Sequence, residues 1–405
     1  MSDSAPLVSV VMPLHNGVEA FRQAMKTLLD QDSSDFEIIC IDDASDDGAR
    51  EVLVHYDSST SRFKAVYHAL KKGAAASRNE GMDIATGKYL LFLDADDLFE
   101  PTLIGRVTAE ACRTNADMVL FGADEFEIEG VYRRNEFFLE DDLIPTACPF
   151  NRDDVPQRLF QLCTPEPWTK LFNREFVVRH RLRFQELQNA NDMLFTLSGL
   201  ALAQRISSVN ERLVHHRVGR PGSIQWSRGR DPLAFLKALR ALGQRLRTEG
   251  LYDRLFKSYA NLVVFHCLFN DDAAAPWADI FAELGVAALP RDSFWLSGDY
   301  ERFVKLVLES WDQSNSRADA FPSDFWYNAA LLQRDELRCV RADLDEVGRQ
   351  TAEAWREAGR IKDSLSFRVG SLLTAPCRLL RTVVRPFVDG HPISAEPRQD
   401  PTNRQ

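Results

Sequence analysis

The chain has 405 residues, of which 45% are hydrophobic, so it can bury a substantial core and is expected to hold more than one domain. Its formal net charge of −11 disfavours general binding to nucleic acid. The seven cysteines form no C-x-x-C pair, which predicts reduced thiols and a cytoplasmic protein. No run of residues has the pattern of a signal peptide or a membrane span, so we expect neither.

The N-terminal part of the chain alternates strand-like and helix-like segments. Apolar runs at 8–12, 36–41 and 89–93 predict buried strands. An amphipathic segment at 19–29 and a segment of small residues at 73–81 predict the helices between them. This β-α-β-α-β order is typical of an α/β fold with a mostly parallel sheet.

Three carboxylates follow the last of these apolar runs at once: Asp94, Asp96 and Asp97. Open α/β sheets bind their ligands at the carboxyl ends of the strands, and clustered negative charge is unfavourable there without a cation. The pattern therefore predicts a divalent metal ion together with a phosphate-bearing ligand. An isolated D-x-D is more often a solvated acidic turn, so the interpretation depends on the motifs around it.

Several spaced motifs together resemble the family 2 glycosyltransferases, whose catalytic domain has the nucleotide-sugar-binding GT-A fold. Members typically show P-x-Y-N, D-D-x-S-x-D, G-x-x-x-A-R-N-x-G and F-L-D-x-D-D at similar separations. Those places are taken here by residues 13–16, 42–47, 73–81 and 92–97. Three later motifs resemble those of bacterial members that build surface polysaccharides, at residues 168–174, 191–195 and 216–224.

The resemblance implies roles for individual residues. A divalent metal ion, manganese or magnesium, would be held by Asp94, Asp96 and Asp97. The base that deprotonates the acceptor hydroxyl would be Asp192. The nucleotide-sugar site would comprise Pro13, His15, Asn16, Asp42, Asp43, Arg78 and Asp94. Contacts to the acceptor or to phosphate would come from Trp168, Lys170, His216 and Arg217.

Three positions depart from the family pattern. His15 replaces the usual Tyr near the nucleobase, although an imidazole can still stack, and Lys71 replaces a common Asn. Asn191 replaces the Glu of an E-D pair, and an amide cannot act as a base, so the base is placed on Asp192 alone. Taken without the other motifs, Asp192 would be interpreted as a helix N-cap.

These features together predict an inverting, metal-dependent enzyme that uses a nucleotide-diphosphate sugar. Its acceptor would be a hydroxyl group of a lipid-linked or surface glycan. Processive members have membrane spans and a Q-x-x-R-W motif, and neither occurs in this sequence, so one sugar per encounter is expected. A catalytically silent homologue that acts as a scaffold in polysaccharide assembly is the alternative. His15 and Asn191 favour that alternative, and the intact acidic cluster opposes it.

The second half of the chain predicts helices and a polar tail. We expect a glycosyltransferase domain at 1–225, a helical region at 226–330, two further helices within 331–388 and disorder at 389–405. Helices of the helical region are predicted at 233–246 and 252–268.

The two further helices carry separate hypotheses. A heptad pattern over 337–365 predicts either a homodimeric coiled coil or a helix docked on its own chain. A basic amphipathic helix at 375–387 carries Arg378, Arg381 and Arg385 opposite its apolar face. It predicts either contact with an anionic membrane surface, the inner face of the cell membrane, or packing on the protein itself.

Overall fold

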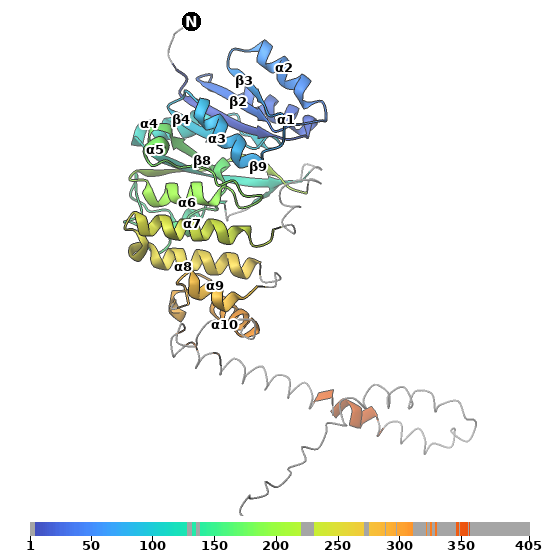
Figure 1. Cartoon of the computed structure of the whole chain (residues 1–405), viewed down its shortest axis with the longest axis vertical. Coiled ribbons are helices and arrows are strands. Elements are labelled where there is room, and N and C mark those ends of the chain that lie inside the picture. Colours follow the sequence, from blue (N-terminus) through green and yellow to red (C-terminus); the bar gives the residue numbers. More distant parts are fainter. Residues whose placement is uncertain are drawn as a thin grey trace, which may run out of the picture. The chain divides into compact units, whose positions relative to one another are not determined.

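The structure is a computed structural model, and it forms two compact units, residues 1–329 and 330–405. It describes residues 5–127, 132–134, 138–219, 231–270, 275–287, 289–296, 298–310, 321, 325, 329, 346, 347, 349–354 and 356. The sheet and the labelled helices all belong to the first unit (Figure 1).

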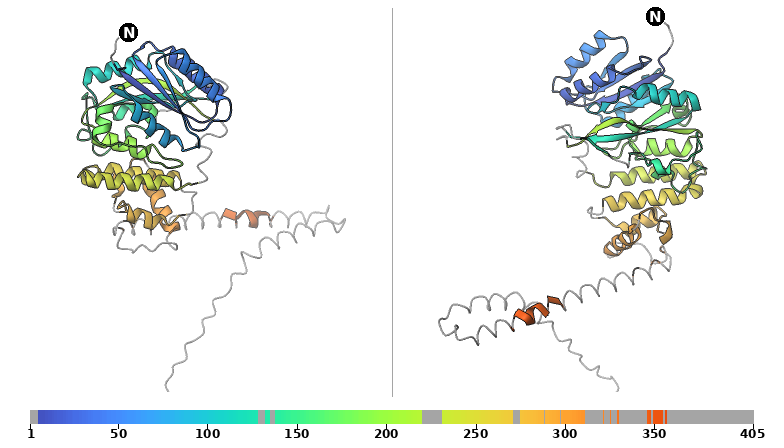
Figure 2. Two further views of the ribbon diagram at one scale, coloured as in Figure 1. Left: turned by 45° about the horizontal axis from the view of Figure 1, so that its top comes forward. Right: turned by 180° about the vertical axis from the view of Figure 1, so that it is seen from behind.

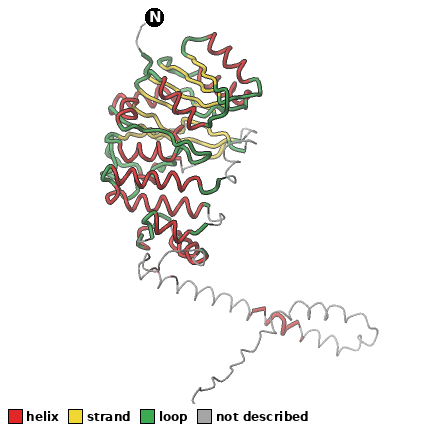
Figure 3. Tube along the Cα trace, viewed as in Figure 1, coloured by secondary structure: helices red, strands yellow, loops and turns green. Residues whose placement is uncertain are grey.

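One mixed sheet, whose strands are yellow in Figure 3, runs through the first unit. Its strand order is β3-β2-β1-β4-β8-β6-β9-β5, with β7 paired with β6. The strands are β1 (Val8–Leu14), β2 (Phe36–Asp42), β3 (Phe63–Tyr67), β4 (Tyr89–Phe92), β5 (Leu98–Phe99), β6 (Met118–Phe126), β7 (Tyr132–Arg134), β8 (Lys170–Asn173) and β9 (Ile206–Arg217). The pairings among β1 to β4 are parallel, and β8 joins β4 to β6 by antiparallel pairings. The expected α/β class is confirmed.

Helices cover both faces of the parallel part of the sheet. These helices are α1 (Val18–Leu29), α2 (Ala49–Ser59), α3 (Ala74–Ile84) and α4 (Leu103–Thr114). Strand β1 is buried on both sides, which explains why its sequence is apolar apart from Ser9. Val10 belongs to the same apolar cluster as Phe21 of α1, whereas Val11 lies on the other face, against α3. Helix α2 and strand β3 were not predicted from the sequence.

Gly81 sets how closely α3 approaches the sheet. A Cβ atom at this position would lie 2.4 Å from Cγ1 of Val11, which is closer than two carbon atoms can pack. The glycine therefore lets α3 lie directly on β1. This contact fixes the height of Arg78, one turn earlier on α3, above the end of the sheet.

The helices after the sheet form successive layers. They are α5 (Arg174–Arg179), α6 (Met193–Leu202), α7 (Ala234–Thr248), α8 (Tyr252–Phe269), α9 (Trp277–Glu283) and α10 (Asp299–Glu309). Helix α6 packs on α7, α7 on α8, and α8 on α10 (Figures 1 and 2). The helices predicted at 233–246 and 252–268 are thus confirmed as α7 and α8. Of the described helices, none is long and apolar enough to cross a bilayer.

The second unit is described only in part. Residues 349–354 are helical, and Val347, a predicted heptad position, is 58% exposed. The outer parts of the heptad segment, the basic helix at 375–387 and the tail at 389–405 lie outside the described residues. The predicted domain boundary at 225 also falls within undescribed residues, 220–230.

Candidate active site

Three parallel strands end at the same edge of the sheet. Pro13 pairs with Ile41 and Leu14 with Asp42, while Val11 pairs with Phe92, the last residue of β4. The loops that follow β1, β2 and β4 therefore emerge together. They carry most of the residues that the sequence predicts for the donor and the metal.

The acidic side chains of the loop after β2 accept hydrogen bonds from other residues of the protein. Asp42 accepts a hydrogen bond from the backbone of Ser45, and the Ser45 hydroxyl accepts one from the backbone of Asn16. The Asn16 amide also exchanges two hydrogen bonds with Asp46, each 2.9 Å long. Asp47 accepts from the backbone of Val18 at the start of α1. Asp42 and Asn16 thus hold the loop after β1 against the loop after β2.

Asp43 anchors the segment that leads into α3. Its two carboxylate oxygens accept from the backbone amides of Lys72 and Gly73 at 2.7 and 2.8 Å, and its Oδ1 lies 2.7 Å from Nδ1 of His68. Burial would raise the pKa of Asp43, but these hydrogen bonds outweigh it and lower the pKa below its usual value. Nδ1 of His15 lies 2.8 Å from the Asp43 backbone carbonyl, and the His15 residue is exposed at the edge.

Arg78 connects the end of β4 to the start of α6. Its Nη2 donates to Oδ1 of Asp94 at 2.7 Å, and its Nη1 donates to Oδ1 of Asn191 at 3.2 Å. The guanidinium is buried and lies over the ring of Phe184, 5.5 Å from the ring centroid. Asp94 remains 27% exposed. A single cation therefore joins the predicted donor carboxylate to the residue before the predicted base.

Asp192 stands at the N-terminus of α6 without capping it. Its side chain makes no capping hydrogen bond, so the N-cap interpretation is not supported. Burial raises the pKa of Asp192 to about 6; the charges of Glu166 and Asp94 act in the same direction, and that of Arg78 opposes them. A carboxylate with this pKa is suited to accept a proton near neutral pH.

The three acidic residues after β4 differ in burial and in their contacts. Asp97 is fully buried, and its Oδ1 accepts from Nδ1 of His216 at 3.0 Å and from the backbone amide of Arg217 at 2.9 Å. Asp96 is half-buried, and its backbone carbonyl accepts from Nε of Arg217. Asp97 thus supports His216 and Arg217, a position that argues against its predicted place among the metal ligands.

His216 and Trp168 stack on each other beside this turn. Their rings lie 4.9 Å apart with an angle of 18° between the planes. Burial would lower the pKa of His216, but the charge of Asp97 and its hydrogen bond, with the charges of Asp94 and Asp96, raise it to about 9. Trp168 also packs edge-on against Phe138. Through its hydrogen bond to Asp97, His216 connects the end of β9 to the turn that follows β4.

Lys170 does not face a ligand in this structure. The residue is 0% exposed, and its Nζ donates to the backbone carbonyl of Glu166 and to the Thr169 hydroxyl. It therefore holds the turn before β8 that carries Trp168. The predicted direct contact of Lys170 with acceptor or phosphate would require this turn to open.

Two residues near the site were missed by the sequence analysis. Oε2 of Glu166 is buried and has no hydrogen-bond partner, and the charge of Glu166 acts on Asp192. Phe184 stacks on Phe195 of α6 at 4.1 Å and packs edge-on against Phe92. Glu166 lies two residues before the Trp168 motif, but no spacing along the sequence connects it with Asp192.

The carboxylates after β4 suit a hard divalent cation whose remaining ligands come from a bound diphosphate. Among the described residues, no three His, Cys, Asp or Glu side chains form a ready metal cage. Magnesium is usually bound by one or two carboxylates plus phosphate oxygens, so a complete protein cage is not required. The partly exposed carboxylates of Asp94 and Asp96 meet that description. The residues therefore fit a manganese or magnesium ion that arrives with a diphosphate.

Comparisons with known proteins agree with this geometry. Residues 9–175 match the family described as Glycosyl transferase family 2. These residues, less than half of the chain, are therefore similar to the family 2 glycosyltransferases. The crystal structure of S. aureus TarS 1–349 in complex with UDP is similar to it, with a TM-score of 0.56 and 19% identity over 76% of this chain and 91% of that one. This likeness confirms the expected GT-A fold.

Curated relatives of the family 2 domain are bacterial proteins. The putative glycosyltransferase EpsH of Bacillus subtilis (strain 168) is 28% identical over 225 residues, which are 54% of this chain and 63% of EpsH. The poly(ribitol-phosphate) beta-N-acetylglucosaminyltransferase TarS of Staphylococcus aureus (strain Mu50 / ATCC 700699) is 22% identical over 258 residues, 60% of this chain and 41% of TarS. The match thus spans less than two thirds of either relative.

Proposed function

We propose that the family 2 domain transfers a sugar from a nucleotide-diphosphate sugar to a hydroxyl group of a surface glycan or of its lipid-linked precursor. The transfer inverts the anomeric centre, depends on a divalent metal ion and adds one sugar per encounter. TarS is a poly(ribitol-phosphate) beta-N-acetylglucosaminyltransferase whose structure has been solved in complex with UDP, and both facts support this choice of donor and acceptor class.

The observation that carries the proposal is the position of Arg78 between Asp94 and Asn191. The first belongs to the predicted metal ligands, and the second is the neighbour of the predicted base. On one side, Asp94 and Asp96 offer oxygens for a metal-bound diphosphate. On the other side, Asn191 presents Asp192, whose raised pKa suits a base. A displacement that inverts needs a base and a leaving group on opposite sides of the sugar. The two amino groups of this guanidinium donate to Asp94 and to Asn191, and this bridge supports a separate position for each group.

Each residue then has a limited task. The exposed ring of His15 stacks on the nucleobase, and Asp43 keeps the loop before α3 in place beneath it. A bound cation would neutralise charge on the departing diphosphate, with Asp94 and Asp96 holding it. Oδ of Asp192 takes the proton of the acceptor hydroxyl as the oxygen attacks the anomeric carbon.

A screen of nucleotide sugars tests the proposal. The protein should hydrolyse one of them slowly, with release of nucleoside diphosphate only when manganese or magnesium is present. Asp192→Asn should lower turnover with acceptor by roughly a hundredfold or more and leave donor binding near normal, because a base acts on the acceptor. Absence of donor binding across the whole screen, with the folded state verified, would refute the proposal and favour the scaffold alternative.

A further inference from the structure

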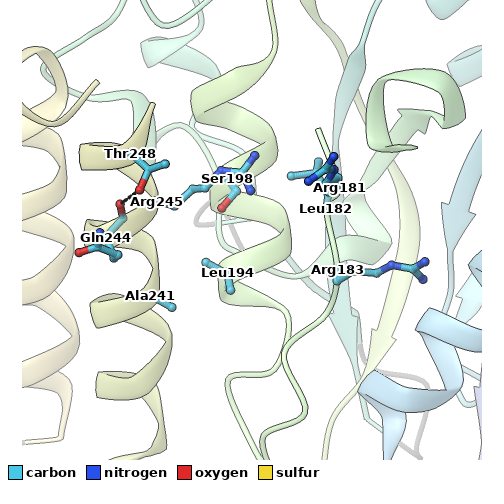
Figure 4. A pocket seen from close by; sticks show the side chains of 9 residues that line it. All are labelled: Arg181, Leu182, Arg183, Leu194, Ser198, Ala241, Gln244, Arg245 and Thr248. Atoms are coloured by element: carbon cyan, nitrogen blue, oxygen red, sulfur yellow. Dashed lines mark hydrogen bonds between the residues drawn. The ribbon is translucent and has the colours of Figure 1, made fainter. Parts of the chain in front are cut away.

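A cavity of ≈ 360 Å³ lies between α6, α7 and residues 181–183. This volume is in the range of small-molecule sites. Figure 4 shows α6 in the centre, with Leu194 and Ser198, flanked by α7 and by the segment that carries Arg181. The lining does not include Asp94, Asp96 or Asp192, so the cavity is separate from the proposed donor and base.

The wall of the cavity contains an unsatisfied hydroxyl group. Ser198 is 3% exposed, and its Oγ has no hydrogen-bond partner within the described part of the chain. A serine in a helix can usually donate to the carbonyl one turn earlier, but this hydroxyl does not. Leaving a buried hydroxyl unpaired is unfavourable, so the position calls for a partner inside the cavity.

The charged side chains that line the cavity are arginines. Nη2 of Arg245 donates to the carbonyl of His180, and its Nε lies 2.9 Å from Oε1 of Glu249, so this guanidinium already has an anionic partner. Arg183 turns away from α6 and pairs with Asp83 of α3 at 2.6 Å (Figure 4).

Arg181 is different from the other two arginines. It is exposed, and its guanidinium has no ion-pair partner among the described residues. Its φ of 51° lies in the left-handed region, which is uncommon for a residue other than glycine. The strained backbone and the unpaired cation occur at one cavity residue. An anionic group would find a free positive charge there.

The remaining residues that line the cavity are mostly apolar, which favours a ligand with both an apolar and a charged part. Leu182 is buried, and Leu194 and Ala241 contribute methyl groups from the two helices. A fully hydrated ion would leave these surfaces unused, whereas a purely apolar molecule would leave Ser198 and Arg181 unpaired. We propose that the cavity binds a small soluble amphiphile, an organic phosphate with a short alkyl chain, through Arg181, Arg245 and the Ser198 hydroxyl.

Isothermal titration calorimetry at low ionic strength tests this site with butyl phosphate, inorganic phosphate and butanol. Butyl phosphate should bind with one site per chain and more tightly than inorganic phosphate, while butanol should give no heat. Ser198→Ala and Arg181→Gln should each weaken butyl phosphate about tenfold or more, since a hydrogen bond to a charged group is lost. Both variants change little volume, and Arg181 is exposed, so both should fold.

Arg179→Gln is the matched control. It removes the same charge two residues before Arg181, from a side chain that forms an exposed ion pair with Glu175. It should bind butyl phosphate as the unaltered protein does. Equal weakening in Arg179→Gln and Arg181→Gln would show nonspecific attraction to the surface and overturn the proposal. Unchanged affinity in Ser198→Ala and Arg181→Gln, or binding of inorganic phosphate as strong as that of butyl phosphate, would do the same. None of these results bears on the proposed glycosyl transfer, which the Asp192 and metal experiments test.

Discussion

Arg78 and Asp94 form a buried-to-surface ion pair, with 2.7 Å between Nη2 and Oδ1, and the same guanidinium donates to Asn191. The end of a central strand and the start of α6, far apart in the sequence, are therefore held by one side chain. Because the guanidinium is a planar fork, it can serve both partners at once. The relative position of donor carboxylate and base thus depends on Arg78.

Replacing Arg78 by lysine should disturb that position. A lysine keeps the charge, but its compact ammonium group cannot reach Asp94 and Asn191 together. We expect turnover to fall by about tenfold or more, with a rise in the KM for the donor and an unchanged circular dichroism spectrum. Arg22→Lys, at an exposed pair with Glu19, is the control. Equal kinetics in Arg78→Lys and Arg22→Lys would show that the bridge is not needed.

Asp192→Asn should make the protein more stable. The folded state raises the pKa of Asp192 from 3.8 to about 6, so it binds that proton more tightly than the unfolded chain does. This proton contributes its full stabilisation at a pH below 3.8, the pKa in the unfolded chain. The contribution is lost as the pH rises through about 6, the pKa in the folded protein. The asparagine variant avoids this loss.

Thermal unfolding at acidic and at mildly alkaline pH measures the effect. At pH above about 6, the variant should exceed the unaltered protein by about 1–3 kcal/mol, and the difference should shrink in acid. A helix N-cap predicts the reverse, because its replacement usually costs about 1 kcal/mol. If the Asp192→Asn protein is less stable than the unaltered protein at neutral pH, Asp192 is a helix N-cap and not a base.

Glu166→Gln should shift the pH dependence of turnover. Asp192 must be unprotonated to act as a base, so kcat should fall below about pH 6. The charge of Glu166 helps to raise the pKa of Asp192, so its removal should move this acidic limb to lower pH. The pH–kcat profile at saturating donor and acceptor measures the shift. Glu186→Gln, on an exposed residue of the loop before Asp192, should leave the limb in place.

Asp96→Asn and Asp97→Asn should have different effects. The first should remove most of the manganese or magnesium dependence with little change in melting temperature, because a partly exposed carboxylate is lost. The second should keep the metal dependence but destabilise the fold by about 3 kcal/mol or more, since it leaves His216 without its buried partner. Manganese titrations and melting curves separate the two. Loss of metal response in Asp97→Asn would restore Asp97 to the ligand set.

Gly81→Ala should destabilise the protein by about 1–3 kcal/mol, because the new methyl group meets Cγ1 of Val11. The double variant Val11→Ala with Gly81→Ala should recover part of this loss, since the smaller residue on β1 makes room. Urea denaturation of the two single variants and the double variant measures the coupling. Strictly additive losses would mean that the close approach of α3 and β1 is not the cause.

The part of the fold that could be predicted is the part with a strong periodic signal. Strands β1, β2 and β4 are mostly apolar because helices cover both faces of this part of the sheet. Strand β3 was missed because it lies at the end of the sheet order, where only Phe63 is buried and its other residues are half-buried or exposed. Its sequence consequently lacks both the apolar run and a clear alternation.

The site was predictable at the level of segments and not of side-chain directions. Asp94, Asp96 and Asp97 are neighbours in the sequence, yet the turn after β4 aims Asp97 at His216 and leaves Asp94 to Arg78. Nothing in a run of carboxylates reveals which of them is buried. Glu166 approaches Asp192 only through the packing of the chain, so no local spacing could have identified it.

The aromatic cluster beneath Arg78 sets a lower limit on the length of a foldable fragment. The family match ends at residue 175, but Phe92 packs on Phe184 and Phe195, which come later in the chain. The backbone amide of Phe160 likewise donates to the hydroxyl of Ser258 on α8. A fragment cut at residue 175 would expose these surfaces to water and aggregate. Efforts to express the catalytic part alone should therefore keep at least the chain through α8.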